Sequence, residues 1–226
     1  MGLIALNCSV NDVKGILQGI KIHARKPVKS GAEFHGGFSN DEDKFYLSAS
    51  PSLDPAFSWY EKSPFGYPGA VLIVREPWYS TTWTDEPNRG NQRIVWKADD
   101  VNYPVARWKP AITMPFYASR LGLLVKRVWI ENLQDISDED CIKEGLFTSM
   151  IQTSTMNSTQ KQKLYRANYD ALGTEPEFHS PKEALEYKWD LKYSRTEYCW
   201  SNDPLVFGTE FEITWNLSKG YYYGSH

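Results

Sequence analysis

The first residues with chemical potential form a basic segment just past a glycine. The stretch GILQGIKIHARKPVK spans residues 15–29, and Lys21 lies two residues after Gly19. Three more cations complete the segment: Arg25, Lys26 and Lys29. Ammonium and guanidinium groups form charge-assisted hydrogen bonds with phosphate oxygens. The segment therefore predicts one wall of a nucleotide-binding cleft, and a solvated basic loop is the alternative.

Charge is distributed unevenly along the chain. Residues 1–30 hold five Lys or Arg against one Asp, residues 101–130 hold five and no acid, and residues 131–144 hold six acids and one Lys. This distribution predicts a polarised cleft in which Glu144 faces Lys21. Separate solvated faces are the alternative. The net charge of −3 argues against non-specific binding of long duplexes, which needs a broadly basic surface.

Five side chains near the ends of apolar segments are candidates for base and phosphate contacts. Arg75 ends one segment, and Ser119 and Arg120 open another, where an arginine can clamp a phosphate or stack on a base. Trp78 and Trp108 offer flat rings on which any base can stack. A structural ion pair is the alternative for Arg75, and core or rim packing is the alternative for the tryptophans.

Cysteine and histidine usage indicates neither a disulfide framework nor a metal site. The 3 Cys are odd in number and far apart, and the 4 His form no metal-ligand spacing with them. We expect no cofactor, and we expect Cys141 and Cys199 to be buried by packing. We find no signal peptide and no apolar run of membrane-spanning length, and the cytoplasm is the simplest compartment.

Three helices are expected to position these residues. SVNDVKGILQGIK carries apolar residues at helical spacing, with Ser9 or Asn11 as its cap and Gly19 at its end. DISDEDCIKEGL predicts a second helix, with Ser137 as its cap and Gly145 as its stop. PKEALEYKWDLKY predicts a third, with a proline near its start.

Four segments have the composition or alternation of strands: 69–78, 93–99, 120–133 and 205–217. We expect 93–99 to return as the hairpin partner of 69–78. Alternation in the last segment predicts that Phe207, Phe211 and Trp215 share one core-facing side.

A length of 226 residues suits one domain, and two stretches read as loop-rich insertions in it. Residues 30–60 are expected to be loop apart from a short strand at KFYLSAS, and residues 147–182 are polar with a loose helical piece near KQKLYRANYDAL. Aromatic residues make up 15% of the chain, which favours a β-rich fold or a surface that stacks on flat ligands. The order of elements predicts an α+β fold, a small mixed β-barrel with flanking helices and a polar insertion.

Four segments carry the motifs of a known family, in the family's order: GIKIHARKPVK, SPFGYPGAVLIVREPW, WKPAITMPFYASRLGLLVKRVWIENLQDISDEDCIKEG and WSNDPLVFGTEFEI. Together they resemble phage and prophage proteins of the ASCH superfamily, and they cover most of the chain outside residues 30–60 and 147–182. The superfamily signature is G-x-K-x-x-E-x-R. Gly19 and Lys21 match it, whereas Ala24 replaces the acid and Lys26 replaces the final arginine.

The resemblance implies a PUA-like β-barrel with a cleft for RNA, single strands or nucleotides. We therefore expect binding of a nucleic acid or a nucleotide, with a modified base as one form of the ligand, in the host cytoplasm if the protein is phage-encoded. The cationic, aromatic and hydroxyl-bearing candidates would meet phosphates or base edges: Lys21, Arg25, Lys26, Lys29, Arg75, Trp78, Trp108, Ser119 and Arg120.

One enzymatic branch of the same superfamily implies an alternative. It removes the acetyl group from cytidine acylated on its exocyclic amine, using a Lys, a Thr three residues on and a Glu. Lys21 and Glu144 match the Lys and the Glu as catalytic residues, but Ala24 stands where the Thr would be. Alanine supplies no oxygen nucleophile, so an amidohydrolase or an RNA hydrolase built here would use a water oriented by Lys21 and Glu144.

A third hypothesis is a protein-interaction module, for example a phage factor that blocks a host defence protein. The polar insertion and the aromatic surplus would serve such a role.

Overall fold

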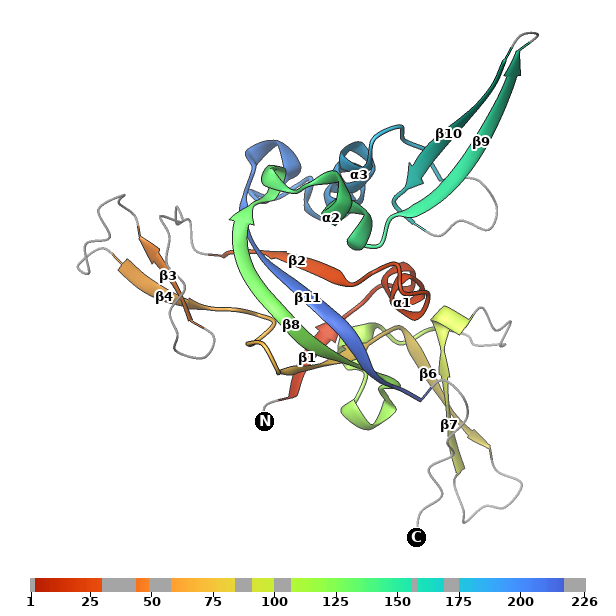
Figure 1. The fold of residues 1–226 in the computed structure, drawn as a ribbon. Coiled ribbons are helices and arrows are strands. Elements are labelled where there is room, and N and C mark those ends of the chain that lie inside the picture. Colours follow the sequence, from red (N-terminus) through yellow and green to blue (C-terminus); the bar gives the residue numbers. More distant parts are fainter. Residues whose placement is uncertain are drawn as a thin grey trace.

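The computed structural model describes residues 3–29, 44–48, 58–83, 91–99, 107–155, 158–168 and 175–217. Within this part of the chain the fold is α+β, with more strand than helix (Figure 1). A five-stranded sheet forms the centre, and three two-stranded hairpins extend from it.

The central sheet has the order β1-β5-β8-β11-β2. Its strands, in that order, are Leu3–Asn7, Val71–Arg75, Leu121–Asn132, Leu205–Asn216 and His23–Pro27. β1 and β5 are parallel, and every other pair is antiparallel. The predicted strands at 120–133 and 205–217 are confirmed as β8 and β11. The described residues form an open sheet with β1 and β2 as its edges, rather than the closed barrel that we expected.

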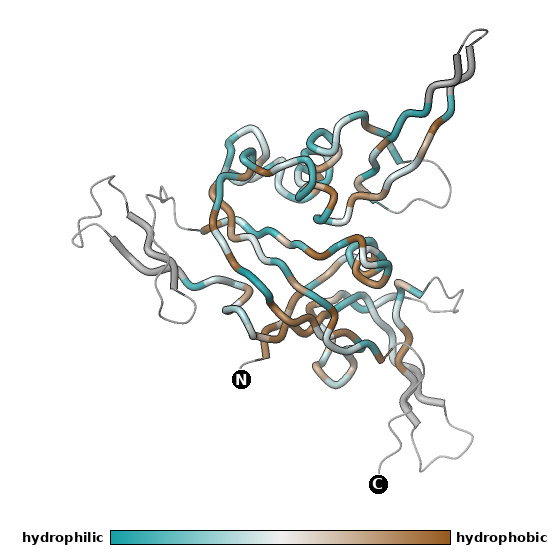
Figure 2. The backbone as a smooth tube through the Cα atoms, in the orientation of Figure 1, coloured by the Kyte–Doolittle hydropathy of each residue, from teal (hydrophilic) through white to brown (hydrophobic). Residues whose placement is uncertain are grey.

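One face of the sheet carries the main hydrophobic core, which helix α1 (Val10–Leu17) covers. Val13 and Ile16 are buried there, as the apolar spacing predicted. Ser9 caps α1 and forms a capping box with Asp12, and Gly19 ends the turn after the helix at φ +70°. β1, β5 and the first half of β8 supply the most hydrophobic stretch of this core (Figure 2).

A second core lies where the C-terminal end of β8 meets helices α2 (Asp138–Lys143) and α3 (Pro181–Tyr193). Ser137 caps α2, as predicted, and Gly145 follows it at φ +88°. Cys141 is fully buried in this core, whereas Cys199 is only half-buried, and all three cysteines are free.

The predicted strand at 69–78 is divided in two. β5 ends at Arg75, and β6 (Trp78–Trp83) pairs with β7 (Asn91–Trp96). The hairpin partner of 93–99 is therefore β6 and not β5. The ladder breaks because the Glu76 amide donates to Met114 Sδ and Pro77 has no amide hydrogen.

The expectation of a strandless insertion at 147–182 is wrong. β9 (Phe147–Thr155) and β10 (Ser158–Arg166) form a projecting hairpin (Figure 1), and β10 includes the first half of the expected helical piece. Its polar, Ser- and Thr-rich strands lack the apolar alternation on which the prediction relied.

The insertion at 30–60 holds the predicted short strand, β3 (Lys44–Ser48). Its partner β4 (Ser58–Lys62) falls partly in residues that we predicted to be loop. Residues 30–43 and 49–57, which make up most of this predicted loop, lie outside the described part of the chain.

Two tryptophans pack flat against glycines across the β8–β11 pair. Gly208 lies opposite Trp129, and Gly122 lies opposite Trp215. A Cβ added at either glycine would run into the facing indole ring. The ring of Trp215 therefore covers backbone and is half-buried, unlike Phe207 and Phe211, which are in the core as predicted.

Candidate functional site

Lys21 and Glu144 are in direct contact, as the sequence predicted. They form an isolated β-bridge between the start of β2 and the end of α2. Lys21 Nζ donates to the Glu144 carbonyl at 2.9 Å and to Glu144 Oε2 at 3.0 Å. Gly145 permits this approach, because a Cβ there would lie 2.9 Å from the Cβ of Lys21.

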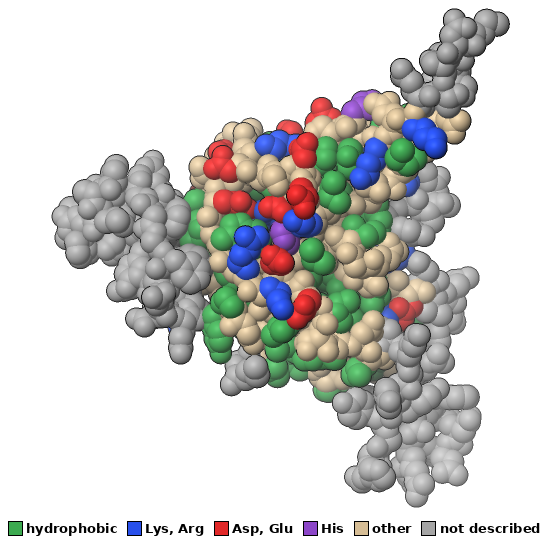
Figure 3. Space-filling view, viewed as in Figure 1, with side chains coloured by type: hydrophobic (Ala, Val, Ile, Leu, Met, Phe, Trp, Pro, Cys, Tyr) green, Lys and Arg blue, Asp and Glu red, His purple; other side chains and the backbone are tan. Residues whose placement is uncertain are grey.

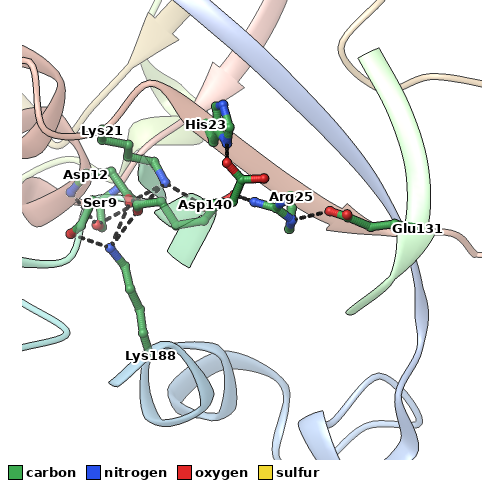
Figure 4. Close-up of polar contacts among 10 residues, drawn as sticks. Ser9, Asp12, Lys21, His23, Arg25, Glu131, Asp140 and Lys188 are labelled. Atoms are coloured by element: carbon green, nitrogen blue, oxygen red, sulfur yellow. Dashed lines mark hydrogen bonds and ion pairs between the residues drawn. The ribbon is translucent and has the colours of Figure 1, made fainter. Parts of the chain in front are cut away.

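Arg25 binds the other oxygen of the same carboxylate, and its guanidinium also pairs with Glu131 (Figure 4). Its Nη1 donates to Glu144 Oε1 at 2.8 Å, and its Nε donates to Glu131 Oε1 at 2.7 Å. Burial alone would raise the pKa of Glu144, but Lys21 and Arg25 outweigh it and lower that pKa to about 2. Glu144 is therefore a buried carboxylate that stays ionised.

Asp12 and Lys188 complete the site, and the sequence signalled neither. Lys188 reaches in from α3, and its Nζ donates to the carbonyls of Glu144 and Gly145, each at 3.1 Å. Asp12 Oδ1 lies 3.5 Å from Lys21 Nζ and 3.8 Å from Lys188 Nζ. Burial, reinforced by the charge of Lys21, lowers the pKa of Lys188 to about 8.

His23 lies beside Arg25 on the same face of β2. Its ring meets Trp129 edge-on at 5.3 Å, and its Nδ1 and Nε2 are 3.7 Å from Asp140 Oδ1 and 3.9 Å from Glu210 Oε2. These distances are too long for hydrogen bonds. Burial, more than any charged neighbour, lowers the pKa of His23, so its ring is neutral near pH 7.

Two buried polar atoms of this site have no hydrogen-bond partner: His23 Nδ1 and Arg25 Nη2. Both side chains are only 1% exposed. Such atoms are rare in folded proteins, because an unpaired buried donor loses its hydrogen bonds to water without replacement.

We call this group the polar cluster: Asp12, Lys21, His23, Arg25, Glu144 and Lys188. Its cations are paired with carboxylates, and acidic and basic side chains alternate around a histidine on this face (Figure 3). These residues therefore do not form the cleft of unpaired positive charge that we expected. Charge runs in sequence do not show which opposite charges will meet in space.

The basic segment is split by strand alternation, since neighbouring side chains point to opposite faces. Lys26 lies on the core side of β2, with its Nζ 4.9 Å from the centre of the Phe65 ring, and Lys29 is exposed. Ala24 is also part of the core. Of the four cations in the segment, only Lys21 and Arg25 reach the polar cluster, which also contains His23 of β2.

Arg120, expected to clamp a phosphate, is instead the centre of a buried ion-pair network. It is 1% exposed, and its Nε and Nη2 donate to Glu76 Oε1 and Oε2 at 2.8 and 3.0 Å. Its Nη1 donates to Asp99. Ser119 also has an internal partner, because its hydroxyl donates to the carbonyl of Val74 at 2.7 Å. In this structure both side chains are therefore bonded to other parts of the protein.

The remaining candidates lie around the segment 107–118. Trp78 is 6% exposed, with Lys109 Nζ 4.6 Å from its ring centre, and Trp108 is half-buried. Arg75 stacks on Phe116 with its Cζ 4.6 Å from the ring centre. Among the described residues, no hydrogen bond or ion pair connects Arg75, Trp78, Ser119 or Arg120 to the polar cluster.

Within the described ranges, no group of three or more His, Cys, Asp or Glu side chains is arranged to hold a metal ion. No described helix combines the length and apolarity needed to cross a membrane.

Comparisons with family models, with curated proteins and with solved structures found no match.

Proposed function

We propose that the protein binds a nucleobase, as part of a nucleotide or a nucleic acid, at the polar cluster. The observation that carries this proposal is the pair of buried, unpartnered atoms His23 Nδ1 and Arg25 Nη2. A base edge presents carbonyl oxygens and ring nitrogens that match a guanidinium donor and an imidazole nitrogen. Binding would return the hydrogen bonds that these atoms lack in the free protein.

The charges of the cluster favour a base edge over a phosphate at this position. Lys21, Arg25 and Lys188 already have carboxylate or carbonyl partners, so a phosphate would compete with Glu144 for them. A neutral polar edge needs only the two unpartnered atoms, His23 Nδ1 and Arg25 Nη2. His23 Nδ1 and Arg25 Nη2 would also contact a base that is modified at its exocyclic amine.

An ASCH-type domain with a PUA-like barrel, encoded by a phage and acting in the host cytoplasm, is part of the same proposal. The five-stranded mixed sheet and Lys21, which follows Gly19 at positive φ, support it. Three free cysteines suit a reducing compartment.

Titration calorimetry with cytidine, uridine, adenosine and cytidine acetylated on its exocyclic amine tests this proposal. We expect binding of at least one nucleoside by the parent and a loss of about tenfold in affinity for His23→Phe, which keeps the ring and removes the nitrogens. His179→Phe is the matched control, because His179 is exposed and already bonded to Gln162. Equal affinities of the parent and His23→Phe would refute the proposal.

Hydrolysis of an acylated nucleoside is a second candidate, favoured by the position of Lys188. Burial would lower the pKa of Lys21, but Glu144 and Asp12 outweigh it and raise that pKa, so Lys21 stays protonated and can donate to an acyl carbonyl. With a pKa of about 8, Lys188 is partly neutral at mildly alkaline pH and can accept a proton from an attacking water. Glu144, with a pKa of about 2, is a weak base.

Release of cytidine from its N-acetylated form, followed by mass, tests this candidate. We expect turnover by the parent that rises with pH through about 8 and is lost in Lys188→Met and Lys21→Ala. Lys182→Met, also on α3, is the control. Absence of turnover by the parent would exclude the hydrolase.

A further inference from the structure

A second surface, separate from the polar cluster, combines exposed aromatic and apolar side chains with cations. The segment that includes the short 3₁₀ helices η3 (Ala111–Thr113) and η4 (Phe116–Ala118) leaves three large apolar side chains in solvent. Ile112 is 68% exposed, Phe116 44% and Tyr117 65%. Exposed apolar side chains that gather in one place commonly mark an interaction site.

Buried contacts and hydrogen bonds hold the backbone of this segment against β6 and β7. Met114 and Ala118 are buried against Trp78, and Met114 Sδ accepts from the Glu76 amide at 3.3 Å. Trp96 Nε1 donates to the Ala118 carbonyl at 3.0 Å. The exposed rings are therefore presented on a fixed backbone, which reduces the entropy that a ligand would have to overcome.

Cations lie within this segment or stack on it. Arg75 stacks on Phe116, and its Nη1 makes a long 3.4 Å contact with the Ile112 carbonyl. Arg75 Nε is buried and unpartnered. Lys109 and Arg107 are exposed, and residues 107–130 include no Asp or Glu. The nearby acids Glu76 and Asp99 are already paired with Arg120.

We propose that this surface, which we call the aromatic platform (Arg75, Arg107, Lys109, Ile112, Phe116 and Tyr117), binds single-stranded nucleic acid. Bases stack on Tyr117 and Phe116, and Lys109, Arg107 and Arg75 meet the phosphates. Aromatic rings interleaved with cations are the combination that sequence-tolerant single-strand binding uses. A protein partner would find no carboxylate to pair with along the segment, which makes it the less favoured occupant.

The platform goes beyond the proposed binding of one base at the polar cluster. The two sites use different residues on different elements. A strand on the platform would raise the local concentration of bases near the protein without needing His23 or Arg25.

Fluorescence anisotropy with short labelled oligothymidylate and oligouridylate, over a series of salt concentrations, tests the platform. We expect the parent to bind, Tyr117→Ala to bind about tenfold more weakly and Tyr117→Phe to bind like the parent, because stacking needs only the ring. Lys109→Glu should weaken binding and reduce its salt dependence.

Two variants serve as matched controls and should bind like the parent. Tyr67→Ala removes a ring that is 37% exposed beyond the opposite end of β5. Lys163→Glu changes an exposed lysine that also lies over an aromatic ring. Thermal unfolding of each variant checks that its fold is intact.

Absence of oligonucleotide binding by the parent, or equal binding by the parent and Tyr117→Ala, would overturn the platform. A lysate protein retained through nuclease treatment by the parent, and not by Tyr117→Ala, would overturn it in favour of a protein partner. Nucleoside titration of Tyr117→Ala distinguishes the two proposals, since failure of the platform leaves binding at the polar cluster unchanged.

Discussion

Glu144 shows how a single residue depends on its neighbours. A buried carboxylate is costly unless paired, and here Lys21 and Arg25 each bind one of its oxygens. Its pKa in the folded protein is about 2, below the usual 4.5, so the folded state binds its proton more weakly than the unfolded state does. The stabilisation is therefore complete above pH 4.5 and is lost as the pH falls towards 2.

We expect acid to destabilise the protein through this residue. The shift corresponds to roughly 3 kcal/mol, lost progressively below pH 4.5. Chemical denaturation of the parent between pH 6 and pH 3 should show this loss, and Glu144→Gln should show a smaller dependence on pH. Glu139→Gln is the control, because Glu139 is exposed in the same helix. A parent with constant stability over this range would contradict the assignment.

The buried Arg120 predicts a large mutational effect far from the polar cluster. We expect Arg120→Met to cost about 3–5 kcal/mol, because the buried Glu76 would lose the arginine that binds both of its carboxylate oxygens. Lys126→Met breaks an exposed pair with Glu212 and should cost about 0–1 kcal/mol. Urea unfolding compares the two, and similar costs would show that Arg120 is not structurally important.

Neighbouring strands fit each other through close side-chain contacts that the sequence of one strand alone does not specify. On the β8–β11 pair, the indole of Trp129 occupies the space above Gly208, and Trp215 does the same above Gly122. The glycine is required by the facing ring, since Gly208 lies in the interior of a strand and shows no positive φ. The face of the sheet that carries the polar cluster therefore depends on this packing, because Trp129 also contacts His23.

We expect Gly208→Ala to destabilise the protein by about 1–3 kcal/mol, because its methyl group displaces the Trp129 ring. Trp129→Ala should relieve the clash, so that the double variant is more stable than the sum of the two single effects implies. Thermal unfolding of the four proteins of this cycle measures the coupling. Additive effects would show that the ring and the glycine do not interact.

At the scale of the whole molecule, the β9–β10 hairpin is a sheet of its own beside the central sheet. The two strands of the hairpin pair only with each other among the described strands (Figure 1). Its base is anchored by the bridge between Tyr165 and Phe178 and by the buried Leu164. The projecting part adds no side chain to the polar cluster.

We expect a truncated hairpin to leave the fold intact. Ser149 pairs with Leu164, so residues 150–163 can be replaced by a two-residue turn without loss of the anchored base. Thermal unfolding and nucleoside titration should give values close to those of the parent. Loss of cooperative unfolding would show that the projecting part stabilises the domain.

Local patterns determined much of this protein. The caps at Ser9 and Ser137, the apolar stripe of α1 and the long apolar run of β8 act between residues close in the chain, so the sequence alone predicted those elements. The contact between Lys21 and Glu144 was predicted as well. The β9–β10 hairpin was missed because its strands carry no apolar alternation.

Apart from the contact between Lys21 and Glu144, only the tertiary structure decided which charges meet. Lys188 and Asp12 joined the polar cluster from two different helices, and Arg120 found Glu76 and Asp99 rather than a ligand. No local pattern specifies such partners. A buried charge pairs with the opposite charge that packing places beside it, and the two residues can be far apart in the chain. Helices and strands can consequently be predicted from short-range spacing. The unpartnered atoms of His23 and Arg25 can be identified only from the tertiary structure, because it shows all of their neighbours.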